Sequence, residues 1–236
     1  MAVYTNTYAP PPPPAELPKD IHLHTKPKEY DFNFLFPVRL LKLDTVELRP
    51  MVPSLHAELY LDGVRKYPEL FKWIAPSPAK TLQEALVFIE KRWRQPSNTL
   101  SYAIFTEPPG STKKVEAEGY VYAGSIALAG CSLLLHSVLD LPPQSGLGLR
   151  RCQWLCSSLN QPSRSATLRM GFKHEGVQRA RMVVPAGKEG ARRGRKGEGV
   201  KRGECDARDD WVFGLVWYEW EQGGKEKVDG LMARQE

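Results

Sequence analysis

The stretch NQPSRSATLRMGF, residues 160–172, decides the fold of this chain. It opens with Asn160, places Ser163 three residues later and ends in Gly-Phe, which gives the pattern N-x-x-S-x₇-G-F. The strand-like segment LRRCQWLCSSL (149–159) precedes it, and the alternating segment FKHEGVQRARMVV (172–184) follows. We therefore predict two strands joined by a short helix that Ser163 can cap.

The segments upstream of this unit predict an opening strand, two helices and a hairpin. TVELRP (45–50) alternates apolar and polar residues, and Ser54 is placed to cap the helix after it. A threonine–glutamate capping box opens a second amphipathic helix, TLQEALVFIEKRW (81–93), which stops near a proline. LSYAIFTE (100–107) and EGYVYAGSIAL (118–128) are then expected as the two strands of a hairpin.

The remaining segments complete an α+β pattern. CSLLLHSVLDL (131–141) predicts a helix, and WVFGLVWYEW (211–220) predicts a last, aromatic strand. The expected architecture is a mixed, largely antiparallel sheet flanked by helices, with one βαβ unit at 118–159.

The order of these segments resembles the GCN5-related N-acetyltransferase (GNAT) superfamily, and within it the subgroup similar to ribosomal-protein N-terminal acetyltransferases. The resemblance implies an acyl-CoA N-acyltransferase-like fold. The N-x-x-S-x₇-G-F pattern resembles the family's C-terminal motif. TVELRPMVPSLHAELY resembles its opening strand and first helix, and GYVYAGSIAL resembles the second strand of its central hairpin. The resemblance covers roughly residues 37–221 and implies transfer of an acetyl group from acetyl-CoA, the co-substrate, to an amine such as a protein N-terminus.

One element of the family pattern is missing from this interpretation. In the family, a further strand and a loop of the type Gln/Arg-x-x-Gly-x-Gly/Ala precede the helix and bind the coenzyme diphosphate through backbone amides. Here Ala129 and Gly130 alone join the expected strand to the expected helix. The amides of Gly130, Cys131 and Ser132 are therefore the remaining candidates for a weakened anion site. Strand 118–128 is expected either to take the missing strand's place or to leave a gap beside it.

A second glycine-rich stretch, PQSGLGLRR (142–150), looks like a phosphate loop but follows the expected helix instead of preceding it. The end of a helix presents carbonyl oxygens and the negative end of its dipole, which repel phosphate. Glycines at such a position are typical of helix C-termini. We therefore do not expect this stretch to bind a nucleotide or coenzyme.

The resemblance implies roles for three side chains of the C-terminal half. Asn160 and Ser163 match the motif and would contact the pantetheine arm, with Ser163 also able to protonate the departing thiolate. The alternative for both is helix capping. Glu175 is a candidate base by position, and its alternative is an exposed strand glutamate. The histidines show no metal-ligand spacing, and we expect no metal site.

Two functions stay open on the sequence. The first is an active, acetyl-CoA-dependent N-acetyltransferase. The second is a catalytically impaired GNAT-like protein or binding module that lacks the diphosphate loop. Binding of nucleic acid through GKEGARRGRKGEGVKR (187–202), which holds seven Lys/Arg and two Glu, would explain those residues alone and is not expected.

Composition sets the remaining bounds on a chain of 236 residues with a net charge of +6. Residues 1–33 are proline-rich and expected to be a disordered or draping tail, 34–221 the folded domain with a flexible basic insertion at 187–208, and 222–236 a polar tail. Four cysteines are too few for a disulfide framework, and no signal peptide or membrane span is recognisable. We expect a cytoplasmic or nuclear protein without a membrane partner.

Overall fold

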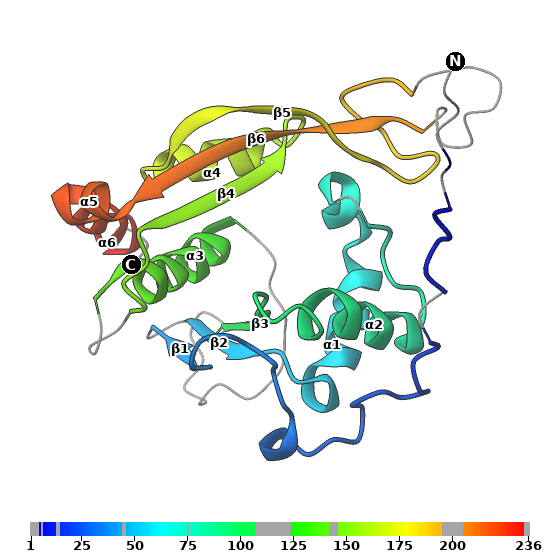
Figure 1. Ribbon diagram of the computed structural model, residues 1–236. Coiled ribbons are helices and arrows are strands. Elements are labelled where there is room, and N and C mark those ends of the chain that lie inside the picture. The colour runs from blue at the N-terminus through cyan, green and yellow to red at the C-terminus, as the bar shows by residue number, and fades with distance from the viewer. Residues whose placement is uncertain are drawn as a thin grey trace.

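The computed structural model describes residues 5, 7–12, 15–43, 46–74, 76–106, 124–141, 146–194 and 205–233, with the backbone alone for 106 and 124–129. The helical and strand elements, including the short 3₁₀ and π segments η1 to η4, follow in chain order (Figure 1). They are η1 (Pro27–Glu29), β1 (Leu41–Lys42), β2 (Val46–Pro50), α1 (Pro53–Lys66), η2 (Pro68–Trp73), α2 (Leu82–Ile89), η3 (Glu90–Arg94), β3 (Tyr102–Thr106), α3 (Gly124–Leu139), β4 (Arg151–Ser157), α4 (Gln161–Arg169), β5 (Lys173–Val183), β6 (Ala207–Val216), α5 (Trp217–Glu219), η4 (Trp220–Gly224) and α6 (Lys225–Ala233).

The strands of the described part form two three-stranded sheets, in the orders β1-β2-β3 and β4-β6-β5, and each pair of neighbouring strands is antiparallel. In Figure 1 the second sheet forms the upper layer, α3 lies beneath it, and the first sheet lies below α3 with α1 and α2 to its side. Helix α3 contacts β1 and β2 of the first sheet and β4 of the second. The expected α+β architecture, with antiparallel sheets flanked by helices, is confirmed.

The register of the second sheet gives it one apolar face. Cys152, Trp154 and Cys156 of β4 lie opposite Leu215, Phe213 and Trp211 of β6, so all six side chains point to the same side. Leu135 and Leu139 of α3, Ala166 of α4 and Met170 pack on this face. The main hydrophobic core of the protein therefore lies between the second sheet and the helices α3 and α4.

The described part of helix α3 begins at Gly124, so the expectation of a strand through residue 128 is wrong for 124–128. Residues 118–123, the rest of that expected strand and of the expected βαβ unit, lie outside the described part of the chain. The continuous apolar run IALAGCSLLL (126–135) has no period that separates a buried strand from a buried helix, and its Ala and Leu residues favour helix. At Gly130 the helix packs closely on the first sheet, because a Cβ there would lie 3.5 Å from Leu48 Cδ2.

The two predicted tails are more ordered than expected. The described part of the expected polar tail, 222–233, does not form a simple tail, because α6 buries Val228 fully and packs Met232 against the core. The expected strand 211–220 ends at Val216, and Trp220, only 1% exposed, lies in the helical segment after it. Val228 and Met232 are four residues apart, so both lie on one face of α6. Two apolar residues are too few to distinguish such a helix from a polar tail in the sequence.

The N-terminal segment drapes over α2 along part of its length. Tyr30 is buried, Ile21 and Leu23 pack against a cluster that includes Leu86, and Asn33 Nδ2 donates to the carbonyl of Arg94 at 3.1 Å. The expectation of disorder for 1–33 is therefore wrong for this part, which follows the draping alternative. Its proline residues prevent helix and sheet pairing but not apolar contact.

The sequence predicts the N-terminal cap of α2 correctly but not that of α1. Thr81 Oγ1 accepts from the Glu84 amide at 3.2 Å, as the capping pattern predicts. Helix α1 begins at Pro53, so Ser54 lies inside it and is not its cap. The amide of Val52 donates instead to Nδ1 of buried His56 at 2.9 Å. A buried histidine thus satisfies one of the donors at the start of α1.

Candidate functional site

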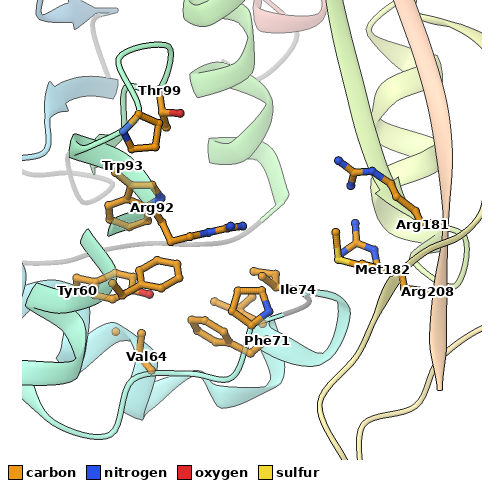
Figure 2. A pocket seen from close by; sticks show the side chains of 15 residues that line it. Tyr60, Val64, Phe71, Ile74, Arg92, Trp93, Thr99, Arg181, Met182 and Arg208 are labelled. Carbon is orange, nitrogen blue, oxygen red and sulfur yellow. The ribbon is translucent and has the colours of Figure 1, made fainter. Parts of the chain in front are cut away.

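A pocket of about 750 Å³ lies between the helical layer and the far ends of β5 and β6 (Figure 2). This volume is within the range of small-molecule sites. Its wall comes from α1, α2, η2, η3 and the segments after η2 and η3 on one side and from β5 and β6 on the other. The lining residues are Tyr60, Gly63, Val64, Leu70, Phe71, Ile74, Pro76, Phe88, Arg92, Trp93, Pro96, Thr99, Arg181, Met182 and Arg208.

Three aromatic rings form a rigid wall on the helical side. Phe88 and Trp93 are 5.2 Å apart in an edge-to-face arrangement, and Tyr60 lies 5.5 Å from Trp93 and 6.3 Å from Phe88. Contacts of this kind are favourable beyond the area they bury. The rings come from α1, α2 and η3, which pack together through Ala85. The helical side of the pocket is therefore apolar and held in one arrangement.

The strand side of the pocket is built on a buried carboxylate. Asp210 of β6 has no exposed surface, and Arg181 Nη1 donates to its Oδ2 at 2.6 Å. Arg208 Nε donates to the other oxygen of Asp210, and Arg208 Nη1 donates to the carbonyl of Trp73 at 3.0 Å. Burying a carboxylate is costly without such partners. The two arginines are therefore fixed by Asp210 at the edge of the pocket.

Arg92 completes the charged part of the pocket from the opposite side. Its side chain is exposed, and no ion pair or hydrogen bond joins it to another described residue. In Figure 2 its guanidinium points across the opening toward Arg181 and Arg208. The pocket thus combines an apolar wall with cationic groups from both sides.

In this structure Asn160 and Ser163 make hydrogen bonds that stabilise the start of α4 and join it to the sheet. Asn160 Oδ1 accepts from the Ser163 amide at 3.1 Å, so Asn160, and not Ser163, is the cap of α4. Ser163 Oγ accepts from the Trp154 indole at 3.0 Å. Burial raises the pKa of the Cys156 thiol, and a hydrogen bond with Ser163 partly offsets this. The capping alternative therefore describes Asn160, and a pantetheine contact stays a prediction for both residues.

Glu175 lies on the opposite face of the sheet from Ser163. Arg151 Nη1 donates to Glu175 Oε1 at 2.6 Å, and a Cβ added at Gly214 would overlap this ion pair. Gly214 faces away from its neighbour Phe213, whose side chain belongs to the apolar face that packs on α3 and α4. The Arg151 guanidinium holds the pKa of Glu175 below its usual value, which makes the carboxylate a weaker base. The structure does not bring Glu175 and Ser163 together.

Gly130, Cys131 and Ser132 lie in the interior of α3 and not at its start. Amides inside a helix are bonded to carbonyls four residues earlier, so they have no free donors for a diphosphate. Burial raises the pKa of the Cys131 thiol to about 11.

The glycine-rich stretch after α3 closes the end of that helix. The amides of Leu147, Gly148 and Leu149 donate to the carbonyls of Ser137, Asp140 and Val138 at 2.8 to 2.9 Å. A Cβ at Gly146 would overlap the backbone of Asp140. Residues 146–149 therefore satisfy helix carbonyls, as expected for a C-terminal closure; residues 142–145 lie outside the described part.

The described part of the basic insertion is paired within the protein. Lys188 Nζ donates to the carbonyls of Ile74 and Pro76, Arg192 Nε binds Asp209 at 2.8 Å, and Arg193 lies 3.6 Å from Asp206. The expectation of a flexible loop is wrong for 187–194, and residues 195–204 lie outside the described part. Among the described residues, no group of His, Cys, Asp or Glu is arranged as a metal site.

The sequence interpretation missed the pocket, because its residues come from 60–99 and 181–208 and no local pattern joins them. In the sequence, Arg92, Arg181 and Arg208 each look like an ordinary charged residue on the solvent-exposed face of a helix or strand. The role of His56 in satisfying a backbone donor at the start of α1 has no sequence signature. Within the described residues, no helix combines the length and apolar character needed to cross a bilayer.

Comparison with solved structures identifies the fold. A GCN5-related N-acetyltransferase from Brucella melitensis has a TM-score of 0.61 at 22% identity, over 84% of this chain and 88% of that one. A probable GNAT-family acetyltransferase from Chromobacterium violaceum has a TM-score of 0.59 at 19% identity, over 90% of this chain and 100% of that one. Mycobacterium smegmatis RimJ, in complex with CoA-disulfide, has a TM-score of 0.52 at 15% identity, over 82% and 93%. No family model and no curated protein matches the chain.

Proposed function

We propose that this chain, which has the fold of the GCN5-related N-acetyltransferases, transfers an acetyl group from acetyl-CoA to the amine of a protein N-terminus or a small molecule. The observation that carries the proposal is the pocket of about 750 Å³ between α1, α2 and the β5–β6 sheet, which is large enough for such an acceptor. The RimJ structure of the same fold, which contains a CoA derivative, supports the choice of co-substrate.

The proposed reaction forms a C–N bond and breaks the C–S bond of the thioester. The amine nitrogen attacks the carbonyl carbon after losing its ammonium proton, and the coenzyme leaves as a thiolate that takes up a proton. The chain contributes a preformed wall, Tyr60, Phe88 and Trp93, that holds the acceptor and excludes water. Positioning of this kind lowers the entropic part of the barrier.

The coenzyme requires a different set of amides from the one predicted on sequence. Gly130, Cys131 and Ser132 do not fit a diphosphate, because their amides lie inside α3. Within the described part of α3, the residues from Gly124 onward lie nearest the N-terminal, positive end of the helix dipole, and they replace Gly130, Cys131 and Ser132 as our candidates for the diphosphate. In Figure 1 this end points toward the side of the molecule where α1 and α2 lie. Asn160 Nδ2 remains a candidate for the pantetheine arm, since the cap uses Oδ1 alone.

Two measurements on the full chain test the proposal. Calorimetry with acetyl-CoA should give saturable binding, and release of free CoA thiol should require an added acceptor. Gly63→Leu is the matched variant, because a side chain at Gly63 meets nothing within 4 Å and would extend into the pocket. We expect it to keep acetyl-CoA binding and to lose thiol release. Absence of binding at millimolar acetyl-CoA would contradict the proposal and would favour a binding module that lacks coenzyme.

A further inference from the structure

Within the described part of the chain, the pocket carries more positive charge than its surroundings neutralise. Arg92, Arg181 and Arg208 line it, and none of the fifteen lining residues is acidic. Among the described residues, Asp210 is the one carboxylate bound to these arginines, and it offsets a single charge and lies fully buried behind the wall. We infer that the pocket takes an acceptor with a carboxylate attached to an apolar body, an inference that rests on the proposed function and narrows its substrate class.

The arginines have donors left for such a carboxylate. A guanidinium has five N–H donors, and Arg181 uses one of them and Arg208 two in bonds to other described residues. Arg92 uses none, and in Figure 2 it faces the other two across the opening. A guanidinium binds a carboxylate through two parallel hydrogen bonds, an arrangement that a lysine cannot reproduce.

The apolar part of the ligand has a matching wall. Tyr60, Phe88 and Trp93 line the pocket together with Val64, Leu70 and Phe71. The rings of Tyr60, Phe88 and Trp93 pack against one another at 5.2 to 6.3 Å. Because these side chains are already ordered, ligand binding costs little side-chain entropy on this wall. A purely ionic ligand such as phosphate would leave this surface in contact with water. The pocket therefore suits an amphipathic carboxylate better than a small anion.

The same charges also affect the acceptor amine. An ammonium ion among arginines is disfavoured, because like charges lower its pKa. A neutral amine is the form that attacks a thioester. A carboxylate bound at Arg92 would thus hold the acceptor while the surrounding cations favour loss of the amine proton.

The first test measures binding to the full chain without coenzyme, by calorimetry at low salt, with 4-phenylbutyrate and its neutral counterpart 4-phenylbutanamide. The carboxylate should bind at least about tenfold more tightly, because its charge strengthens the hydrogen bonds that it accepts from the guanidinium groups. Arg92→Gln should remove about tenfold of this affinity, and added salt should weaken it. Arg179→Gln, on an exposed β5 residue outside the pocket, should bind like the parent.

Two further arms identify the source of the carboxylate and the place of binding. Pentapeptides with a free N-terminus and either Asp or Asn at the second to fourth positions distinguish an acidic peptide from a small-molecule acceptor, and a preference for the acid in either series supports the inference. Gly63→Leu should abolish binding of both probes. Equal affinity for acid and amide in both series, an equal loss with Arg179→Gln, or full binding by Gly63→Leu would overturn it. Because no coenzyme is present, these outcomes are independent of acetyl transfer.

Discussion

The two faces of the sheet β4-β6-β5 differ in what lies on them. One face carries Trp154, Phe213 and Leu215 and packs on α3 and α4. The other carries Asp210 with its two arginines and the Arg151–Glu175 pair. The motif that connects the sequence with its fold, Asn160 and Ser163, therefore belongs to the packed face, and the candidate acceptor pocket lies at the charged one. The motif residues that indicate the fold and the arginines that could bind a ligand therefore lie on opposite faces of the same sheet.

Removing the buried carboxylate should break the charged face. Asp210→Asn leaves Arg181 and Arg208 without their counterion, and loss of one partner of a buried ion pair costs about 3–5 kcal/mol. Urea denaturation should show this loss, and the remaining folded protein should bind 4-phenylbutyrate more tightly, because the pocket gains one net charge. Stability within about 0.5 kcal/mol of the parent, as is usual for surface substitutions, would contradict the assigned role.

Acidification should destabilise the protein through the buried side chain of His56. Burial lowers the pKa of His56 from 6.5 to about 4, and Arg49 acts in the same direction. Because the unfolded chain binds this proton near pH 6.5 and the folded chain only near pH 4, stability falls as the pH drops between those values. The full difference corresponds to about 3 kcal/mol.

His56→Asn is the matched variant for this effect, since its Oδ1 can accept from the Val52 amide and does not titrate. Denaturation midpoints of both proteins from pH 7 to pH 4 give the contribution of His56 by difference. A parallel pH dependence in the two proteins would show that His56 is not the group responsible.

Local patterns predicted the packed face well and the pocket not at all. The helix at 161–169, the strand at 151–157 and the Thr81 cap depend on neighbouring residues, so their signals are contained in short segments. Residues 124–128 were assigned to a strand because a short buried apolar run fits both structures. The pocket joins Arg92 with Arg181 and Arg208 only through tertiary packing, which no short segment encodes.

The cap of α4 offers a smaller change on the packed face. Asn160→Ala removes the acceptor for the Ser163 amide and should cost about 1 kcal/mol. Asn160→Asp should restore most of this stability, since aspartate caps equally well. If Asn160 acts only as a cap, the affinity for acetyl-CoA is the same in parent, alanine and aspartate variants. Loss of coenzyme binding in a folded Asn160→Asp protein would instead support the pantetheine contact.

Glu175 should give the smallest effect. Its carboxylate and Arg151 are each 37% exposed, and exposed ion pairs contribute about 0–1 kcal/mol. Glu175→Gln should therefore change the urea midpoint little and leave the rate of thiol release within about twofold, because its lowered pKa makes it a poor base. A fall of about a hundredfold or more would identify Glu175 as the general base after all.

The central claim is that the acceptor binds at the charged face of the sheet and not at the packed one. The indole N–H signals of two tryptophans, one at each place, test this claim. Trp93 lines the pocket, and the Trp154 indole donates to Ser163 on the opposite face. Their N–H signals in a ¹H–¹⁵N spectrum can be assigned with Trp93→Phe and Trp154→Phe. During titration with 4-phenylbutyrate we predict that the Trp93 signal shifts and saturates while the Trp154 signal stays in place. A shift of Trp154 with Trp93 unmoved would contradict the account.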